Sequence, residues 1–127
     1  MKSGQGLYLP SALLCFSIFI SWNAMNGSWI IEKHNGYNLM LQEEDRMNGK
    51  EYARLIDKGM ISVKLFFGSA YPKQFDVYIH PTRRSLDSTW RRDWNMPTFS
   101  SECWMVASGV ASKLDMISPK MWAKESW

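Results

Sequence analysis

Residues 50–81 constrain the fold more than any other part of the chain, because they combine the patterns of an amphipathic helix, a tight turn and a strand. The helical part repeats apolar residues every three or four positions, and the face expected to be core carries Tyr52, Leu55, Ile56, Gly59, Met60, Val63, Phe66 and Phe67. Gly68 suits a helix C-terminus, and Pro72 prevents continuation. From Phe75 to His80 apolar and polar residues alternate, as in a half-buried strand. This segment predicts a helix docked on a sheet, and no catalytic motif is visible in it.

A β-hairpin is predicted before this helix. Ile30–His34 and Tyr37–Leu41 flank an Asn-Gly pair at residues 35–36, which favours a type I′ turn with positive φ at both positions. A two-residue loop sets Leu41 opposite Ile30 on the same face. We therefore expect two antiparallel strands joined by a type I′ turn.

The connection from the hairpin to the helix, Gln42–Asn48, is polar and ends at a candidate N-cap, Asn48. Its acidic residues, Glu43, Glu44 and Asp45, are compatible with a cation site or with a solvated loop. The residue spacing of a calcium-binding loop is absent. The solvated loop is therefore the favoured interpretation.

A second, shorter helix is predicted after the strand. It begins at residues 82–85, and Leu86, Trp90 and Trp94 then recur every four positions. Arg91 and Arg92 lie on its outer face, so this combination would also fit a site for an anionic ligand or a nucleic acid. A Leu/Trp stripe at helical spacing is more often core, and we favour that interpretation.

The remaining strand candidates are Trp104–Val110 and residues 114–117. The first is rich in small residues that leave its backbone approachable: Ala107, Ser108, Gly109 and, just beyond it, Ala111. Such a stretch fits a bulge, close packing, or a sheet edge where a peptide pairs. From the residues alone, the bulge or packing interpretation is the stronger one.

These elements predict an α+β fold. We expect a mixed or mainly antiparallel sheet, formed by the N-terminal hairpin and the central strands. It is backed by one long amphipathic helix over residues 50–67 and a shorter Trp-rich helix. A chain of 127 residues with 46% apolar residues fits one domain, assigned to residues 29–127 and expected to be the N-terminal part of a larger domain. The order of the strands does not follow from the sequence.

The first 28 residues have the features of a secretory signal. Lys2 precedes an apolar segment at residues 7–22, and small polar residues follow it. The apolar run is shorter than most membrane-spanning helices, and Pro10 interrupts its start. We therefore favour export, to the periplasm or the exterior, over an uncleaved membrane tether. No stable membrane insertion is expected after signal removal.

Removal of the signal would leave Cys103 as the only cysteine, so no internal disulfide is expected. A lone cysteine in an apolar setting is usually a small buried hydrophobe, and we expect Cys103 to be buried.

Motifs of several enzyme classes are missing from the sequence. His34 and His80 lie in separate elements without a second ligand at helical spacing, so no zinc motif is present. GxSxG, SxxK, GxxxxGK[ST] and GxGxxG are absent as well. His80 at a strand end is eligible as an acid or base, although a structural hydrogen bond is the commoner role. The net charge of +3, from interleaved charges, gives little support for a nucleic-acid partner.

Three stretches resemble, in their order, the N-terminal half of a gluzincin zinc metallopeptidase of the peptidase MA-like kind. They are FFGSAYP at residues 66–72, FDVYIHP at 75–81 and WMVASGVASKLDMISP at 104–119, within a resemblance that spans about 30–127. In that family a helix ending in Phe-Gly, a proline-containing turn and a strand come first. A strand at the edge of the cleft follows, and then the zinc-binding HExxH helix. The present sequence ends where that helix would begin, so no zinc ligand or catalytic glutamate carries over.

The resemblance implies a substrate-edge strand that pairs with an extended peptide through its backbone, at Ala107, Ser108, Gly109 and Val110. It implies the non-catalytic N-terminal half of an exported zinc-metallopeptidase-like hydrolase, with zinc expected only if a C-terminal half exists. An exposed apolar face near Trp122 and Trp127 would receive that half. The alternative is a complete small exported α+β domain that binds a peptide, glycan or protein partner and has no enzymatic activity. An HExxH encoded beyond Trp127 would discriminate between the two.

Overall fold

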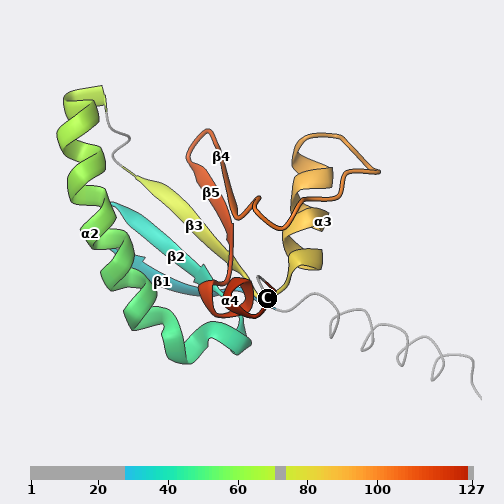
Figure 1. The fold of residues 1–127 in the computed structure, drawn as a ribbon. Coiled ribbons are helices and arrows are strands. Elements are labelled where there is room, and N and C mark those ends of the chain that lie inside the picture. The colour runs from blue at the N-terminus through green and yellow to red at the C-terminus, as the bar shows by residue number, and fades with distance from the viewer. Residues whose placement is uncertain (1–27, 71–73, 126–127) are drawn as a thin grey trace, which may run out of the picture.

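The computed structural model describes residues 28–70 and 74–125, and within them five strands form one mixed sheet with the order β1-β2-β3-β5-β4 (Figure 1). The sheet and its helices confirm the predicted α+β class. In chain order the elements are β1 (Ile30–His34), β2 (Tyr37–Leu41), the 3₁₀ helix η1 (Glu43–Asn48), α2 (Gly49–Phe67), the 3₁₀ helix η2 (Gly68–Ala70), β3 (Phe75–His80), α3 (Arg83–Asp93), β4 (Ala107–Val110), β5 (Lys113–Ile117) and α4 (Pro119–Glu125).

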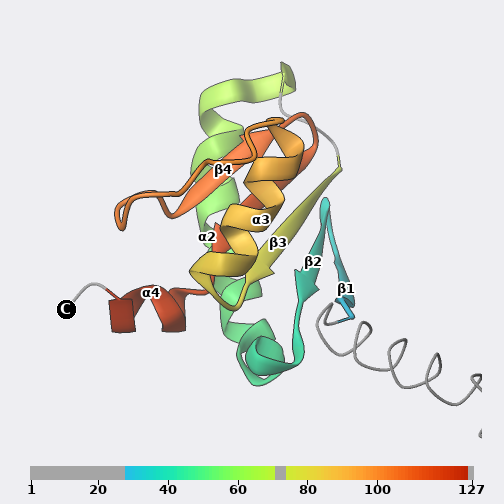
Figure 2. The same cartoon turned by 90° about the vertical axis from the view of Figure 1, so that its right-hand side faces the viewer.

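The sheet is mixed because its three central strands, β2, β3 and β5, run parallel, whereas β1 and β4 are antiparallel to their neighbours. Parallel neighbours need a crossover connection, and helices α2 and α3 lie in the two crossovers. The helices cover opposite faces of the sheet, α2 on one side and α3 on the other (Figures 1 and 2). On β5, Leu114 and Met116 pack against the core under α2, whereas Ile117 belongs to the core under α3.

The hairpin β1–β2 has the predicted bounds and pairs Ile30 with Leu41, as expected. The predicted type I′ turn is wrong, because Gly36 has a positive φ (92°) and Asn35 does not. The carbonyl of Gly36 accepts a hydrogen bond from the Phe75 amide (3.3 Å), so the turn is joined to the start of β3.

The larger core lies between α2 and the sheet. Its strand residues are mostly the alternate positions predicted to face inwards, and α2 contributes three buried residues. The members are Tyr37, Leu39, Leu41, Val77 and Ile79 from the strands and Tyr52, Ala53 and Met60 from α2. This arrangement confirms a helix docked on a half-buried strand.

The apolar face predicted for α2 is buried only in part. Leu55, Val63, Phe66 and Phe67 are exposed, Phe66 by 83%. For Val63, Phe66 and Phe67 the reason is length: α2 has 19 residues and extends about 28 Å, whereas the six residues of β3 span about 20 Å. The C-terminal turns of α2 therefore project beyond the sheet, and the prediction that they are core is wrong.

The smaller core lies between α3 and the opposite face of the sheet. Leu86 and Trp90 are buried there against Ile117. Partly buried residues complete this cluster: Trp94, Phe99, Met105, Val106 and Met121. Trp90 stacks on Trp94 with ring centroids 5.0 Å apart. The Leu/Trp stripe is therefore core, as predicted.

The C-terminal part differs from the sequence prediction in two places. The strand predicted over Trp104–Val110 begins only at Ala107, and Trp104 lies in the preceding loop. A short helix that was not predicted, α4, follows β5 and begins at Pro119. Proline fits the first position of a helix, because its missing N–H would have no intrahelical partner there and its φ is already helical.

Candidate functional site

A chain of polar contacts runs across the sheet face that packs against α3. Ser85 Oγ lies 2.9 Å from His80 Nδ1, and His80 Nε2 lies 2.8 Å from Asp115 Oδ1. Lys113 Nζ lies 2.9 Å from Asp115 Oδ2 and donates to Asp93 Oδ2 at 2.6 Å. His80 and Asp115 are buried, whereas Ser85 is half-buried. A serine, a histidine and an aspartate are thus connected by hydrogen bonds.

The fold brings these residues together from three elements. Tyr78 on β3 pairs with Asp115 on β5, and His80, two residues further along, points to the same face as Tyr78. Ser85 lies in the first turn of α3. The Thr82 side chain caps that helix by accepting a hydrogen bond from the Ser85 amide (3.1 Å), which fixes the position of Ser85 above the end of β3.

The hydrogen-bond partners of His80 are the basis for assigning its tautomer. Both oxygens of Asp115 act as acceptors, one for Lys113 and one for His80. The proton of the neutral imidazole is therefore assigned to Nε2, and Nδ1 is left as an acceptor for the Ser85 hydroxyl. In this arrangement His80 is placed as a general base for Ser85.

The series of polar contacts ends at an ion pair between Lys113 and Asp93. The hydrogen bond from Lys113 lowers the pKa of Asp93 against the opposing effect of burial. Burial opposes the charge on Lys113, but its bonds to Asp93 and Asp115 outweigh burial and raise the Lys113 pKa. Lys113 thus remains charged near neutral pH and holds the carboxylate that orients His80.

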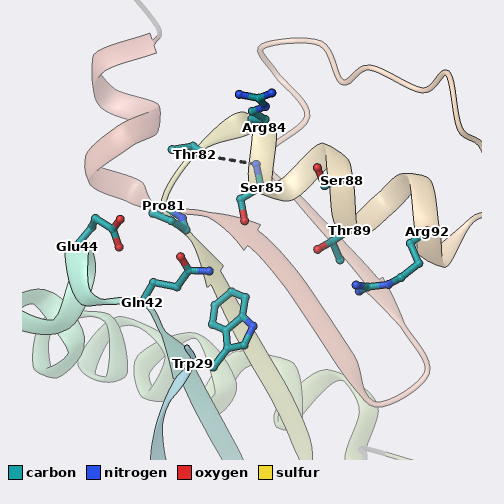
Figure 3. Close-up of a pocket in the computed structure, with 10 residues that line it drawn as sticks. All are labelled: Trp29, Gln42, Glu44, Pro81, Thr82, Arg84, Ser85, Ser88, Thr89 and Arg92. Atoms are coloured by element: carbon teal, nitrogen blue, oxygen red, sulfur yellow. Dashed lines mark hydrogen bonds between the residues drawn. The ribbon is translucent and has the colours of Figure 1, made fainter. Parts of the chain in front are cut away.

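Two adjoining pockets lie beside this chain. The larger, of about 740 Å³, is lined by Trp29, Gln42, Glu44, Pro81, Thr82, Arg84, Ser85, Ser88, Thr89 and Arg92 (Figure 3). The smaller, of about 220 Å³, reaches His80 and Asp115 and shares Trp29, Thr89 and Arg92 with the larger. In Figure 3 the Ser85 hydroxyl points from the start of α3 towards the strands, and Arg92 reaches from the same helix towards Trp29.

Little of this site could be predicted from the sequence. His80 was eligible as an acid or base, with a structural hydrogen bond as the favoured role. Ser85 and Asp115 belong to no local motif, since 35 residues separate His80 from Asp115. Only the parallel pairing of β3 with β5 connects them, and one sequence does not predict that pairing.

The predicted substrate-edge residues, Ala107, Ser108, Gly109 and Val110, are the four residues of β4. Among the strands of residues 28–70 and 74–125, this one lies at an end of the sheet and pairs with β5. Pairing of a peptide with it stays a prediction.

The pairing of β4 with β5 determines which backbone groups face outwards. The Val106 carbonyl accepts from the Ile117 amide (2.9 Å), and hydrogen-bonded pairs alternate along an antiparallel ladder. Ser108 and Val110 therefore direct their amide and carbonyl groups to β5. Ala107 and Gly109 direct theirs to the open edge.

Asp45 is buried at 2% exposure, so the predicted solvated loop is wrong at this residue. Its Oδ1 accepts from Tyr52 Oη at 2.6 Å and from Ser118 Oγ at 2.9 Å. Asn48 precedes α2 but makes no side-chain cap to the helix, and its amide lies 3.5 Å from Asp45 instead. These contacts join η1, α2 and the end of β5.

We expect Tyr52→Phe to lower the free energy of unfolding by about 2 kcal/mol, because it removes a buried hydrogen bond to a charged acceptor. In Tyr37→Phe the lost hydroxyl is buried as well; it lies 3.0 Å from Asp57 Oδ1 and 3.3 Å from the Ala53 carbonyl, and we expect a loss of about 1–2 kcal/mol. Urea denaturation measures both. A Tyr52→Phe loss below about 0.5 kcal/mol would contradict a stabilising role for Asp45.

Two further sequence predictions concern surface residues. Cys103 is exposed, so its predicted burial is wrong; it lies in the loop that connects α3 with β4, on the outside of the smaller core. Trp122 on α4 is 44% exposed. Trp127 lies outside the described residues, as does the predicted signal or tether at residues 1–28 apart from Ser28.

Within residues 28–70 and 74–125, no group of three or more His, Cys, Asp or Glu side chains is arranged to hold a metal ion. Among the helices of that same part of the chain, none combines the length and the apolar character needed to cross a membrane.

Compared with known proteins, the chain matches no family model, no curated protein sequence and no solved structure.

Proposed function

We propose that this chain binds an extended peptide along the open edge of β4, as the scaffold and substrate-edge part of an exported zinc-metallopeptidase-like protein. The observation that carries the proposal is the pair of outward-facing backbone positions in β4. Ala107 and Gly109 each offer an amide donor and a carbonyl acceptor at the edge of the sheet. An added peptide strand would satisfy these groups by main-chain hydrogen bonds.

The side chains of β4 support this proposal. Ala107 and Gly109 are small and exposed, so a second backbone could approach to the normal strand spacing of about 4.8 Å. Val110 within the strand and Trp104 before it are exposed by 47% and 72%. They would supply apolar contacts to alternate side chains of the peptide.

The two sequence hypotheses share this contact and differ in what surrounds it. In a metallopeptidase-like protein, zinc and the HExxH glutamate would come from outside these 127 residues, which lack that motif. In a small exported binding domain, peptide pairing would be the whole function. Zinc content and peptidase activity, measured on this chain and on one extended through whatever the gene encodes downstream, distinguish the two.

A short capped peptide of alternating threonine and valine is a suitable probe for pairing at β4. Gly109→Pro removes the outward amide and adds a ring at the edge, while it leaves the ladder to β5 intact. We expect it to weaken binding at least about tenfold, equivalent to about 1.4 kcal/mol.

Gly109→Ala is the matched control. A Cβ at this position meets only the Lys113 carbonyl at 3.9 Å, an ordinary contact, and the outward amide remains. Isothermal titration calorimetry should give near wild-type affinity for Gly109→Ala. Equal affinities for the proline and alanine variants would exclude backbone pairing at this position.

A further inference from the structure

We propose that Ser85 is an activated nucleophile that cleaves small carboxylic esters in the pocket beside α3. This activity is separate from peptide pairing at β4 and uses different residues. It depends on a connected serine, histidine and aspartate next to a pocket that the serine itself lines.

The contacts of Ser85 differ from those of an ordinary surface serine. Its hydroxyl is 2.9 Å from the acceptor nitrogen of His80, a residue only 1% exposed. A free serine hydroxyl is a weak nucleophile, and an adjacent general base activates it by taking its proton as the new bond forms. Asp115 is a positioning residue, because it holds the imidazole in the tautomer that leaves Nδ1 free to accept.

The pocket provides space and complementary charge for a substrate. It adjoins the Ser85 hydroxyl on the side where Trp29 and Arg92 lie (Figure 3). Arg84 and Arg92 line the larger pocket with one carboxylate, Glu44. Trp29 offers an apolar surface. Arg92 donates from Nε to Asp93 Oδ1 at 3.1 Å, and its terminal guanidinium nitrogens, directed towards Trp29, are the donors for a substrate carboxylate (Figure 3). The geometry favours small esters that carry a negative charge.

The chemical step balances without a cofactor. Ser85 Oγ attacks the ester carbonyl carbon, and its proton passes to His80 Nδ1. The bond from carbon to the alkoxy oxygen breaks, His80 returns the proton to that oxygen, and the alcohol leaves. Water then attacks the acyl-serine, gives one proton to His80, and the carboxylic acid departs as the proton returns to Ser85 Oγ.

A fluorophosphonate probe followed by peptide mass spectrometry tests the proposal on the folded full chain. We expect a covalent adduct on Ser85 and none on Ser88, an exposed serine that also lines the pocket. Ser85→Ala should abolish the adduct. Ser100→Ala, at an exposed loop serine outside the pocket, should leave labelling unchanged.

Substitutions of His80, the general base, and of Asp115, the positioning residue, test the proposal independently. His80→Gln should slow Ser85 labelling about 100-fold or more, the usual contribution of a general base. If His80→Gln does not fold, by circular dichroism, Asp115→Asn serves instead, with an expected slowing of about tenfold or more. Absence of an adduct on Ser85 of the folded protein, or equal labelling of Ser85 and Ser88, would overturn the proposal and leave the chain of contacts as a structural link between α3 and the sheet.

Discussion

Replacing Trp90 with alanine is expected to lower the free energy of unfolding by about 3–5 kcal/mol. Trp90 is 1% exposed and lies at the centre of the smaller core, between Leu86 and Ile117. It also stacks on Trp94, with ring centroids 5.0 Å apart, and meets the ring of Phe99 edge-on. Alanine would leave a large apolar cavity that these neighbours cannot fill without moving.

Trp104→Ala is the matched control for this substitution. Trp104 is 72% exposed in the loop before β4, so we expect a change within about 0.5 kcal/mol. Guanidinium denaturation followed by circular dichroism measures both variants. A small loss for Trp90→Ala would mean that α3 is not packed on the sheet, and the pocket and the Ser85 contacts would lose their support.

Leu39→Ala is expected to lower the free energy of unfolding by about 2–5 kcal/mol. Leu39 is fully buried in β2, where its neighbours across the sheet are Glu32 and Val77. Its side chain is part of the core that joins the sheet to α2. Removal of three carbon atoms there loses apolar burial and leaves a cavity.

Leu65→Ala provides the comparison on α2. Leu65 is 82% exposed near the end of the helix that projects beyond the sheet. We expect a change within about 0.5 kcal/mol, because neither burial nor packing is lost. A Leu65→Ala loss as large as that of Leu39→Ala would contradict the exposure of the last turns of α2.

The sequence predicts local elements well where one periodicity dominates. Alternating residues gave the bounds of β1 and β2, and helical spacing identified α2 and α3. The buried Leu86 and Trp90 also follow from a local pattern. Each of these features depends on residues close together in the chain, so a single sequence contains the necessary information.

Features that depend on the relative lengths of a helix and the sheet, or on partners distant in the sequence, could not be predicted from the sequence. The apolar face of α2 was expected to be core throughout, because its periodicity says nothing about the span of the sheet beneath it. Asp45 was expected in solvent, because its partners Tyr52 and Ser118 become neighbours only after folding. Alternating residues predicted a strand over Trp104–Val110, but those residues alone did not give its place in the sheet.

The two candidate sites also differ in how much of each could be predicted from the sequence. The four β4 residues were named from local composition together with a family resemblance, and all four lie in one strand. The Ser85–His80–Asp115 chain was missed because it needs β3 and β5 to be parallel neighbours. A serine and an aspartate on either side of a histidine in space have no fixed spacing in the sequence.

The most direct test of peptide pairing is an amide-resolved NMR titration of the isotope-labelled protein with the alternating threonine/valine peptide. The expected result is saturable chemical-shift changes centred on the Ala107 and Gly109 amides, with intermolecular contacts between the α-proton of Ser108, which faces the open edge, and α-protons of the peptide. Saturable shifts that leave these two amides unchanged, or no shifts at any concentration reached, would contradict the proposal that β4 is a peptide-binding edge.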